Sequence, residues 1–315
     1  MKGCLAVTGA LGGLGANVVR EAVATGMEVR ALVRRDPGSA APKGVTYVRG
    51  DAGNVKDMAA LVRGADAVLH CANVNITQDW AATVLRLIDV ALEACVGEGV
   101  RLVFPANVWV FGRGEPGVRF PESRAVAPIS AMGRARAEQE KRIRESKAPF
   151  AMVRLPEFYG PHVVTLTGPP LRAATLGKTV QWFGKPDVDV ELVFMPDGAR
   201  AMVAVASNAA AEGHCFHVPG ARAITPRAYF AEAIRQTSGR SGFRCVPAWA
   251  VRLAGRIYAP ARAFADIVHL WEDPVLLDGS SYEKTIGPLP RTPYEEGIAR
   301  TLEWIAANPG VKMYY

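Results

Sequence analysis

Short apolar runs alternate with longer segments of helical periodicity through the first half of the chain. The short runs predict buried parallel strands at residues 4–7, 28–33, 45–49, 67–70 and 101–104. Between them, residues 16–25 and 80–95 carry apolar side chains at helical spacing. This alternation predicts an α/β fold with a Rossmann-like, doubly wound parallel sheet, which binds its ligand at the carboxyl ends of the strands.

The first strand leads directly into a glycine-rich turn before a helix. The turn reads Thr8-Gly9-Ala10-Leu11-Gly12-Gly13-Leu14-Gly15. Gly9 permits a tight turn, Gly12 lets the backbone approach a pyrophosphate, and Gly15 lets the helix pack on the strand. The N-terminus of the helix also favours an anion. The segment predicts a dinucleotide site, and an ordinary tight turn is the alternative.

The second strand ends in two basic residues, Arg34 and Arg35. In dinucleotide-binding folds an acid at this place binds the 2′-hydroxyl of the adenosine ribose, whereas an arginine accommodates a 2′-phosphate. The pair therefore favours NADP, with NAD as the second option. A solvated basic turn is the alternative.

Composition and charge exclude several classes of partner. The chain has 315 residues, half of them hydrophobic, so it can bury a full core. Its net charge is +7, but no dense basic and aromatic tract is present, so we expect no nucleic-acid partner. No apolar run is long enough to cross a bilayer, so we expect no membrane partner.

Cysteine and histidine spacing indicates neither disulfides nor a metal site. The five cysteines form no Cys-x-x-Cys pair, and no secretory leader precedes the first strand, which together indicate a cytoplasmic protein. His214 and His217 lie three apart on an expected strand and point to opposite faces, so they cannot chelate together.

Several segments together resemble the extended (atypical) short-chain dehydrogenase/reductase family, in its NAD(P)-dependent epimerase/dehydratase group. In the N-terminal half they are Thr8-Gly9-x-x-Gly12-x-x-Gly15, Gly50-Asp51, His70-x-Ala72, Val110-Phe111-Gly112 and the run Arg154-Leu155-Pro156-Glu157-Phe158-Tyr159-Gly160-Pro161. The C-terminal half fits more loosely, through Asp197, Thr225-Pro226 and Thr292-Pro293-x-Glu295. The resemblance implies further cofactor contacts at Asp51 on the adenine, at Cys71, Ala72 and Asn73 on the ribose side, and at Ala52, Pro156 and Phe158.

The sequence departs from this family where the chemistry is expected. Asn107 stands in the place of a serine or threonine, Met132 in that of the tyrosine, and Arg136 in that of the lysine. A thioether cannot transfer a proton, and an arginine stays protonated at neutral pH. Asn107 can polarise a substrate oxygen, and Arg136 can hold ribose or phosphate oxygens of the cofactor. The usual proton donor is therefore missing.

Other side chains near the expected pocket are candidates to replace the missing proton donor. His162 is the catalytic candidate among them, and the further candidates are Glu157, Tyr159, Cys71 and Asn73. Enzymes of this family that act on sugar nucleotides usually carry an arginine at the position of Val190, so its absence counts against such a substrate.

The remaining motifs concern helix starts and the C-terminal core. Asp197, Thr225 and Thr292 are expected to begin helices, the last through a capping box with Glu295. Core packing is the expected role of four aromatic residues, Trp249, Tyr258, His269 and Trp271, with substrate contact as the alternative.

We predict a dinucleotide-binding domain over 1–160, to which about 191–210 return, and a smaller C-terminal α/β substrate-binding region over 161–190 and 211–315. The first functional hypothesis is an NADP(H)-dependent oxidoreductase or epimerase that acts on a small carbonyl or hydroxyl compound. The alternative is a non-catalytic NADP-binding redox sensor or regulator. A homodimer is compatible with either.

Overall fold

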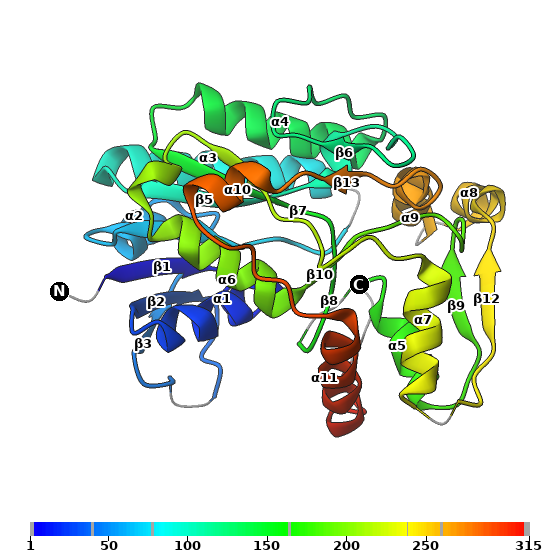
Figure 1. Cartoon of the computed structure of the whole chain (residues 1–315). Coiled ribbons are helices and arrows are strands. Elements are labelled where there is room, and N and C mark those ends of the chain that lie inside the picture. Colours follow the sequence, from blue (N-terminus) through cyan, green and yellow to red (C-terminus); the bar gives the residue numbers. More distant parts are fainter. Residues whose placement is uncertain are drawn as a thin grey trace.

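The computed structural model describes residues 3–38, 41–76, 79–162, 165–237, 239–258 and 261–311. Its centre is a seven-stranded sheet in the order β11-β7-β5-β4-β1-β2-β3, in which all neighbours are parallel (Figure 1). The strands are β1 (Cys4–Thr8), β2 (Glu28–Val33), β3 (Val45–Arg49), β4 (Ala67–His70), β5 (Arg101–Asn107), β7 (Phe150–Leu155) and β11 (Cys215–His217). The predicted fold class is confirmed.

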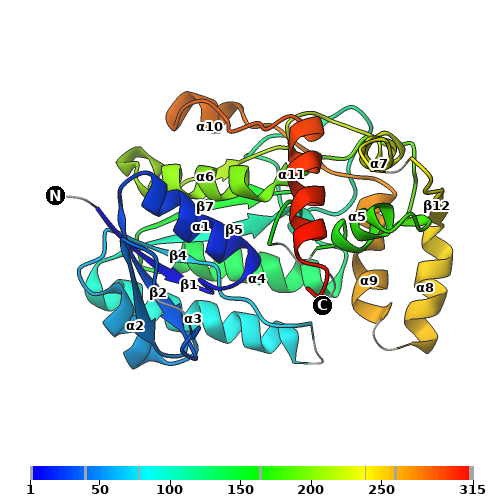
Figure 2. The same ribbon diagram turned by 90° about the horizontal axis from the view of Figure 1, so that it is seen from below.

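Helices cover both faces of this sheet. One face carries α1 (Gly13–Ala24) and α6 (Met195–Ala206), and the other carries α2 (Val55–Val62), α3 (Trp80–Glu98) and α4 (Ala131–Glu145), as Figures 1 and 2 show. Because successive side chains of a strand point to opposite faces, Leu5 and Val7 join the first core and Ala6 joins the second. Burial on both faces explains why the strands are continuous apolar runs.

The strand boundaries follow the sequence closely. The second, third and fourth strands begin and end where the apolar runs predict. The fifth continues past Phe104 to Asn107, because the register with β7 extends to the pair Asn107–Leu155. Asn107 therefore lies at the carboxyl edge of the sheet, where the ligand is expected.

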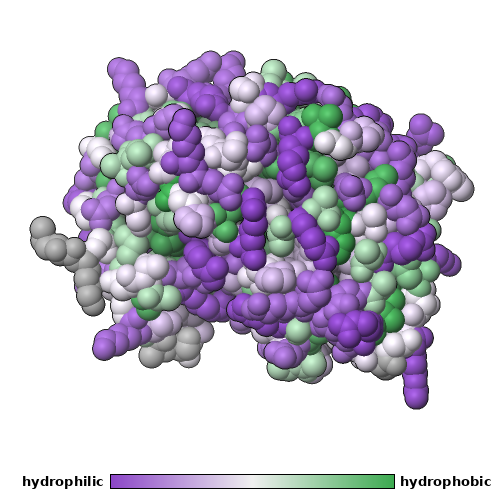
Figure 3. All heavy atoms as spheres, viewed as in Figure 1, coloured by the Kyte–Doolittle hydropathy of each residue, from purple (hydrophilic) through white to green (hydrophobic). Residues whose placement is uncertain are grey.

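A smaller region lies beyond β7. It contains the strand pairs β8 (Glu157–Tyr159) with β10 (Leu192–Phe194) and β9 (Val180–Phe183) with β12 (Phe243–Val246). A third pair joins β6 (Arg119–Phe120) to β13 (Leu276–Leu277). The helices of the smaller region are α5 (Gly168–Thr175), α7 (Pro226–Arg235), α8 (Ala248–Ile257), α9 (Arg262–Ile267) and α11 (Tyr294–Ala307). Hydrophilic side chains predominate on the molecular face in Figure 3.

The central sheet includes elements that the sequence assigns to the substrate-binding region. β11 belongs to the central sheet, and α10 (Ser280–Thr285) packs against it, although both fall within the predicted substrate-binding region 211–315. The strand is only three residues long, so it carries too few positions for a readable pattern.

Three predicted helix starts have different outcomes. Thr225 caps α7 by accepting the Ala228 N–H, as predicted. Asp197 is not an N-cap: it lies in the first turn of α6 and accepts the N–H of Thr292 at 2.6 Å and its hydroxyl at 2.9 Å. Because Thr292 is used in this way, the expected capping box does not form, and Pro293 precedes α11 without a side-chain cap.

The C-terminal aromatic residues divide into two sets. Trp271 and His269 are buried, as expected. Trp249 and Tyr258 are not core residues, since they are 67% and 62% exposed. His217 is also buried, where its ring bonds the Phe120 carbonyl and the Arg154 guanidinium.

Candidate active site

The glycine turn forms a cradle between β1 and α1. Gly9 adopts φ +62°, and a Cβ there would lie 2.5 Å from the Cys71 carbonyl oxygen. A Cβ on Gly15 would lie 2.1 Å from the Gly9 oxygen. Both glycines are therefore required by the protein's own backbone, as the sequence predicts for a tight turn and close helix packing.

Gly12 has a different environment. Its N–H donates to the Gly9 carbonyl at 2.9 Å, and a Cβ on it would meet no other atom of the described chain than that oxygen, at 3.2 Å. Within 4 Å of that Cβ, the described residues thus leave the space outside Gly12 open at the N-terminus of α1. A backbone without Cβ beside such a helix end fits a pyrophosphate, so the residues present suit a dinucleotide.

Thr8 links the cradle to the end of β4. Its hydroxyl accepts the Ala72 N–H at 3.1 Å and lies 3.2 Å from Nδ1 of His70. Burial, together with the charge of Arg136, lowers the pKa of His70 to about 4, so the ring is neutral at physiological pH. His70 is thus part of the site, although the sequence singled it out only within the His70-x-Ala72 motif.

The expected adenosine end lies at the tips of β2 and β3. Arg34 and Arg35 are exposed there, so their guanidinium groups face solvent. Asp51 is also exposed, and its carboxylate accepts the Gly53 N–H at 2.7 Å. These side chains are accessible to a ligand at the edge where the fold binds one.

On the ribose side, just after β4, Asn73 Oδ1 accepts the Val74 N–H at 3.0 Å. Burial raises the pKa of the Cys71 thiol to about 12, so it is not a nucleophile at neutral pH. Cys71 therefore contributes its backbone carbonyl, against Gly9, rather than reactive sulfur.

At the reacting end, Asn107 and Arg136 both lie next to Trp109. Asn107 Oδ1 accepts the Trp109 N–H at 3.0 Å and so caps the short helix η1 (Val108–Val110). The Arg136 guanidinium lies 5.1 Å from the Trp80 ring and 5.9 Å from the Trp109 ring, and donates to Gln139 at 2.9 Å. The structure thus brings Asn107, Arg136 and His70 into one neighbourhood.

Met132 lies in an apolar cluster rather than among polar groups. It is 6% exposed and packs with Trp80, Val84, Ile267 and Leu270. A side chain buried in this way, with no ionisable group, cannot take the role of the family's proton donor.

Next to this cluster, α9 contacts the N-terminus of α4. Asp266 accepts the N–H of Ala131 at 3.1 Å and that of Met132 at 2.9 Å, while Ser130 accepts that of Gly133. A carboxylate at a helix N-terminus satisfies free donors and interacts favourably with the dipole. No signal near Met132 in the sequence predicts this partner, whereas Trp109 is two residues from Asn107 and Trp80 begins a predicted helix.

The other catalytic candidates lie in β8 and just after it. Tyr159 is fully buried among Phe194, Tyr229 and Tyr294, and burial raises the pKa of its phenol. His162 has φ 63°, its ring lies 4.9 Å from that of Trp304, and burial lowers its pKa. The catalytic role predicted for His162 remains a prediction.

Glu157 is the candidate with a pKa near neutrality. It is half-buried, and burial raises its pKa to about 7, opposed by hydrogen bonds from the N–H groups of Phe158 and Leu166. Leu155 pairs with Asn107, and Glu157 follows two residues later, roughly 7 Å further along the chain. Pro156 is buried and Phe158 packs on the core beneath α6.

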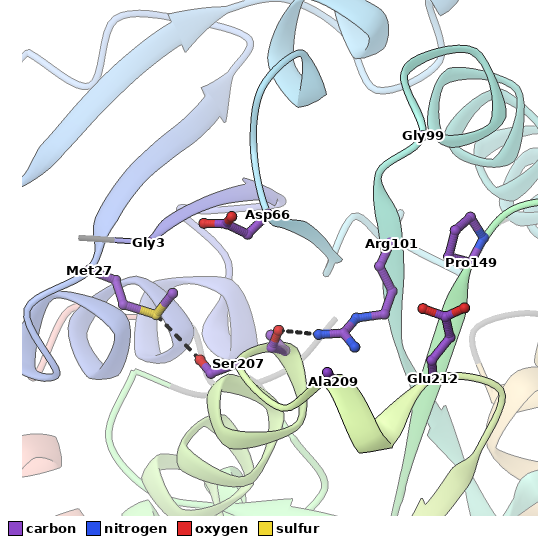
Figure 4. Close-up of a pocket in the computed structure, with 10 residues that line it drawn as sticks. Gly3, Met27, Asp66, Gly99, Arg101, Pro149, Ser207, Ala209 and Glu212 are labelled. Carbon is purple, nitrogen blue, oxygen red and sulfur yellow. Dashed lines mark hydrogen bonds between the residues drawn. The ribbon is translucent and has the colours of Figure 1, made fainter. Parts of the chain in front are cut away.

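A cavity of about 500 Å³ lies at the other edge of the sheet. It is lined by Gly3, Gly99 and Pro149, which precede β1, β5 and β7, and Arg101 extends across it to donate to the Ala206 carbonyl (Figure 4). Because ligands of such sheets bind at the carboxyl ends, this cavity is separate from the site.

Among the described residues, no group of three or more histidines, cysteines and acids could hold a metal ion. In the same part of the chain, no helix is long and apolar enough to span a bilayer.

Comparison with known proteins adds a family and a fold. Residues 5–218 match the NAD dependent epimerase/dehydratase family. A ceramide reductase of Caulobacter vibrioides is 27% identical over an alignment of 172 residues that covers 51% of this chain and 48% of that protein. The match thus spans about half the length of this curated relative.

Two solved structures are similar over nearly their whole length. DesIV, a dTDP-glucose 4,6-dehydratase from Streptomyces venezuelae with NAD bound, has a TM-score of 0.79 and 22% identity, and 98% of each chain is covered. A UDP-glucose 4-epimerase from Thermotoga maritima has a TM-score of 0.79 and 19% identity, with 97% of this chain and 99% of that one covered. At such identities these similarities show the fold.

Proposed function

The chain belongs to the NAD-dependent epimerase/dehydratase family, and from that premise we propose that it is an NADP(H)-dependent oxidoreductase or epimerase whose active site lacks the usual tyrosine and lysine. The observation that carries the proposal is the cradle at Gly12, where a Cβ would meet only the Gly9 oxygen within 4 Å among the described residues, while Arg34 and Arg35 are exposed after the neighbouring strand β2. That arrangement suits a dinucleotide with a 2′-phosphate.

Separate groups of residues would bind the cofactor and orient the substrate. The turn over 8–15 binds the pyrophosphate, and Arg34 and Arg35 bind the 2′-phosphate. The bound nicotinamide supplies hydride chemistry. Arg136, beside the rings of Trp80 and Trp109, provides a fixed positive charge close to the ribose. Asn107 orients the reacting oxygen of the substrate.

The substrate that we propose is a carbonyl or hydroxyl compound with an apolar portion. Support comes from the side chains around Met132, which are apolar, and from Val190 in the place of an arginine. The similarity to a ceramide reductase points in the same direction, since a ceramide is a lipid. A sugar nucleotide, by contrast, needs a charged group for its diphosphate.

The test measures cofactor binding and hydride transfer separately. NADPH and NADH are titrated into the protein by calorimetry, and long-chain ketones, small ketones and sugar nucleotides are then screened at the nicotinamide absorbance. Turnover of a long-chain compound supports the proposal. Tight NADPH binding with no turnover of any compound would overturn it in favour of a redox sensor.

Arg34→Asp should remove the preference for NADPH. We expect the parent to bind NADPH at least about tenfold more tightly than NADH, which is about 1.4 kcal/mol, and the variant to bind both equally or to prefer NADH. Lys147→Asp, an exposed charge reversal before β7, is the matched control and should leave the ratio unchanged. Equal affinities in the parent would refute the assignment of Arg34.

Met132→Leu should keep turnover within a few-fold, because the two side chains have similar volume and neither carries a transferable proton. Asn107→Ala should lower kcat more than it weakens cofactor binding, because the amide acts on the reacting oxygen. Steady-state kinetics and cofactor titration on both variants provide the comparison. Complete loss of activity in Met132→Leu, with normal cofactor affinity, would contradict the assignment of this position.

A further inference from the structure

The outer face of α8 carries a row of exposed apolar side chains. Trp249, Leu253 and Ile257 are spaced four residues apart, so they lie on one face of the helix. They are 67%, 50% and 81% exposed, and Tyr258, which follows the helix, is 62% exposed. Large apolar side chains are rarely so exposed in a contiguous row unless they bind something.

The row is held in place by tight packing on the opposite face. Val251 is buried there, and a Cβ on Gly255 would lie 2.5 Å from Cβ of Ala265. α8 therefore lies directly against α9, with its outer face on the edge of the molecule in both ribbon views (Figures 1 and 2). The exposed row is thus a property of a well-packed helix, not of a loose segment.

This part of the sequence is rich in arginine. Residues 233–265 contain six arginines and no lysine, aspartate or glutamate, so the segment itself carries a charge of +6. Arg244, Arg256 and Arg262 are exposed, on β12, α8 and the start of α9. Two others have acidic partners, since Arg235 pairs with Glu232 and Arg252 with Glu272.

We propose that α8 docks the protein onto an anionic phospholipid membrane, with the row from Trp249 to Tyr258 inserted among the headgroups and upper acyl chains. Short helices with aromatic and aliphatic side chains on one side and arginines beside them bind at this interface. The surrounding positive charge selects an anionic lipid surface over a neutral one. A second copy of this chain would bring the same arginines together and is disfavoured by repulsion.

This proposal departs from the sequence-based expectation of no membrane partner. That expectation rests on the length needed to cross a bilayer, whereas α8, with 10 residues, would lie flat on its surface. The neighbouring α9 supplies Ile267 and Asp266 to the N-terminus of α4. Docking would therefore bring the apolar cluster around Met132 close to the lipid, and this consequence alone rests on the proposed function.

The test is flotation of the full chain with vesicles, without cofactor or substrate. The parent should bind vesicles containing phosphatidylglycerol, should bind pure phosphatidylcholine vesicles at least about tenfold less, and should be released by salt. The double variant Trp249→Ser/Ile257→Ser should lose at least about tenfold in binding. Arg256→Glu/Arg262→Glu should lose the preference for the anionic lipid.

The matched control replaces exposed apolar side chains elsewhere, as Val96→Ser/Leu176→Ser, and should bind vesicles like the parent. Circular dichroism checks that each variant is folded. Equal binding by the α8 variant and the control would overturn the proposal, as would failure of the parent to bind anionic vesicles. Dimerisation lost in the α8 variant, with no vesicle binding by the parent, would assign the face to a second copy. Because vesicle binding needs no nicotinamide, these outcomes are separate from failure of the proposed activity.

Discussion

Replacing Gly12 with valine should reduce dinucleotide affinity at least about a hundredfold, which is about 2.7 kcal/mol, while the chain stays folded. A Cβ at this position meets only the Gly9 oxygen, at 3.2 Å, so the protein accommodates it with a small adjustment. The added methyl groups would fill the space through which the backbone N–H groups reach a pyrophosphate. Calorimetric titration with NADPH and thermal unfolding measure the two effects separately.

Two other glycine variants serve as controls, one expected to be neutral and one expected to unfold the chain. Gly97→Val in α3 places its side chain where no atom lies within 4 Å, so binding and folding should be normal. Gly15→Ala should lose both folding and binding, because its Cβ would lie 2.1 Å from a backbone oxygen. If folded Gly12→Val bound NADPH as tightly as the parent, the cradle would not be the pyrophosphate site.

The sheet could be predicted from the sequence because each parallel strand is buried on both faces. Burial on both sides requires a continuous apolar run, and the runs at 28–33, 45–49 and 67–70 coincide with β2, β3 and β4. The cradle was predictable for a related reason. Gly9 has a positive φ, and a Cβ on Gly15 would meet the Gly9 oxygen within the same turn, so the glycine spacing is visible in the sequence.

Features that depend on distant partners could not be predicted in this way. Asp197 looks like a helix cap, yet its carboxylate binds Thr292, 95 residues away. Asp266 caps α4 from a distance of 134 residues, and no local pattern connects the two. Each depends on how the smaller region packs against the sheet.

The exposed face of α8 was missed for a different reason. Its apolar residues have ordinary amphipathic spacing, and such a pattern is usually the buried face of a helix. The sequence therefore predicts a core role for Trp249 and Tyr258. In the structure, the small residues Ala248, Val251 and Gly255 form the buried face, because close approach to α9 requires little side-chain volume there.

Glu157 is the side chain that we expect to supply the proton in place of the family's tyrosine, whose position we propose for Met132. Among the four ionisable candidates, burial raises the pKa of Cys71 to about 12, raises that of Tyr159 and lowers that of His162. Burial raises the pKa of Glu157 to about 7, which suits exchange at neutral pH. Its position two residues after Leu155, the register partner of Asn107, places it at the reacting end of the sheet.

Glu157→Gln should lower turnover by about a hundredfold or more and remove the pH dependence near neutrality. In the parent, carbonyl reduction needs the protonated acid, so kcat should fall as the pH rises through about 7, and alcohol oxidation should show the opposite trend. Glu303→Gln, on the exposed side of α11, is the control and should keep the parent's profile. A Glu157→Gln enzyme with the parent's rate and profile would move the proton source to water or to the substrate.

Stability measurements distinguish this role from a purely structural one. The pKa of Glu157 is raised in the folded state, from 4.5 to about 7, so the unfolded chain loses the proton first as the pH rises. The stabilisation that Glu157 gives the folded parent is therefore complete below about pH 4.5 and lost by about pH 7. Glutamine does not titrate. In urea titrations, the free energy of unfolding of Glu157→Gln should therefore rise relative to that of the parent as the pH increases across this range. That gain, together with an unchanged pH–rate profile, would show that Glu157 is a buried structural acid and does not deliver the proton.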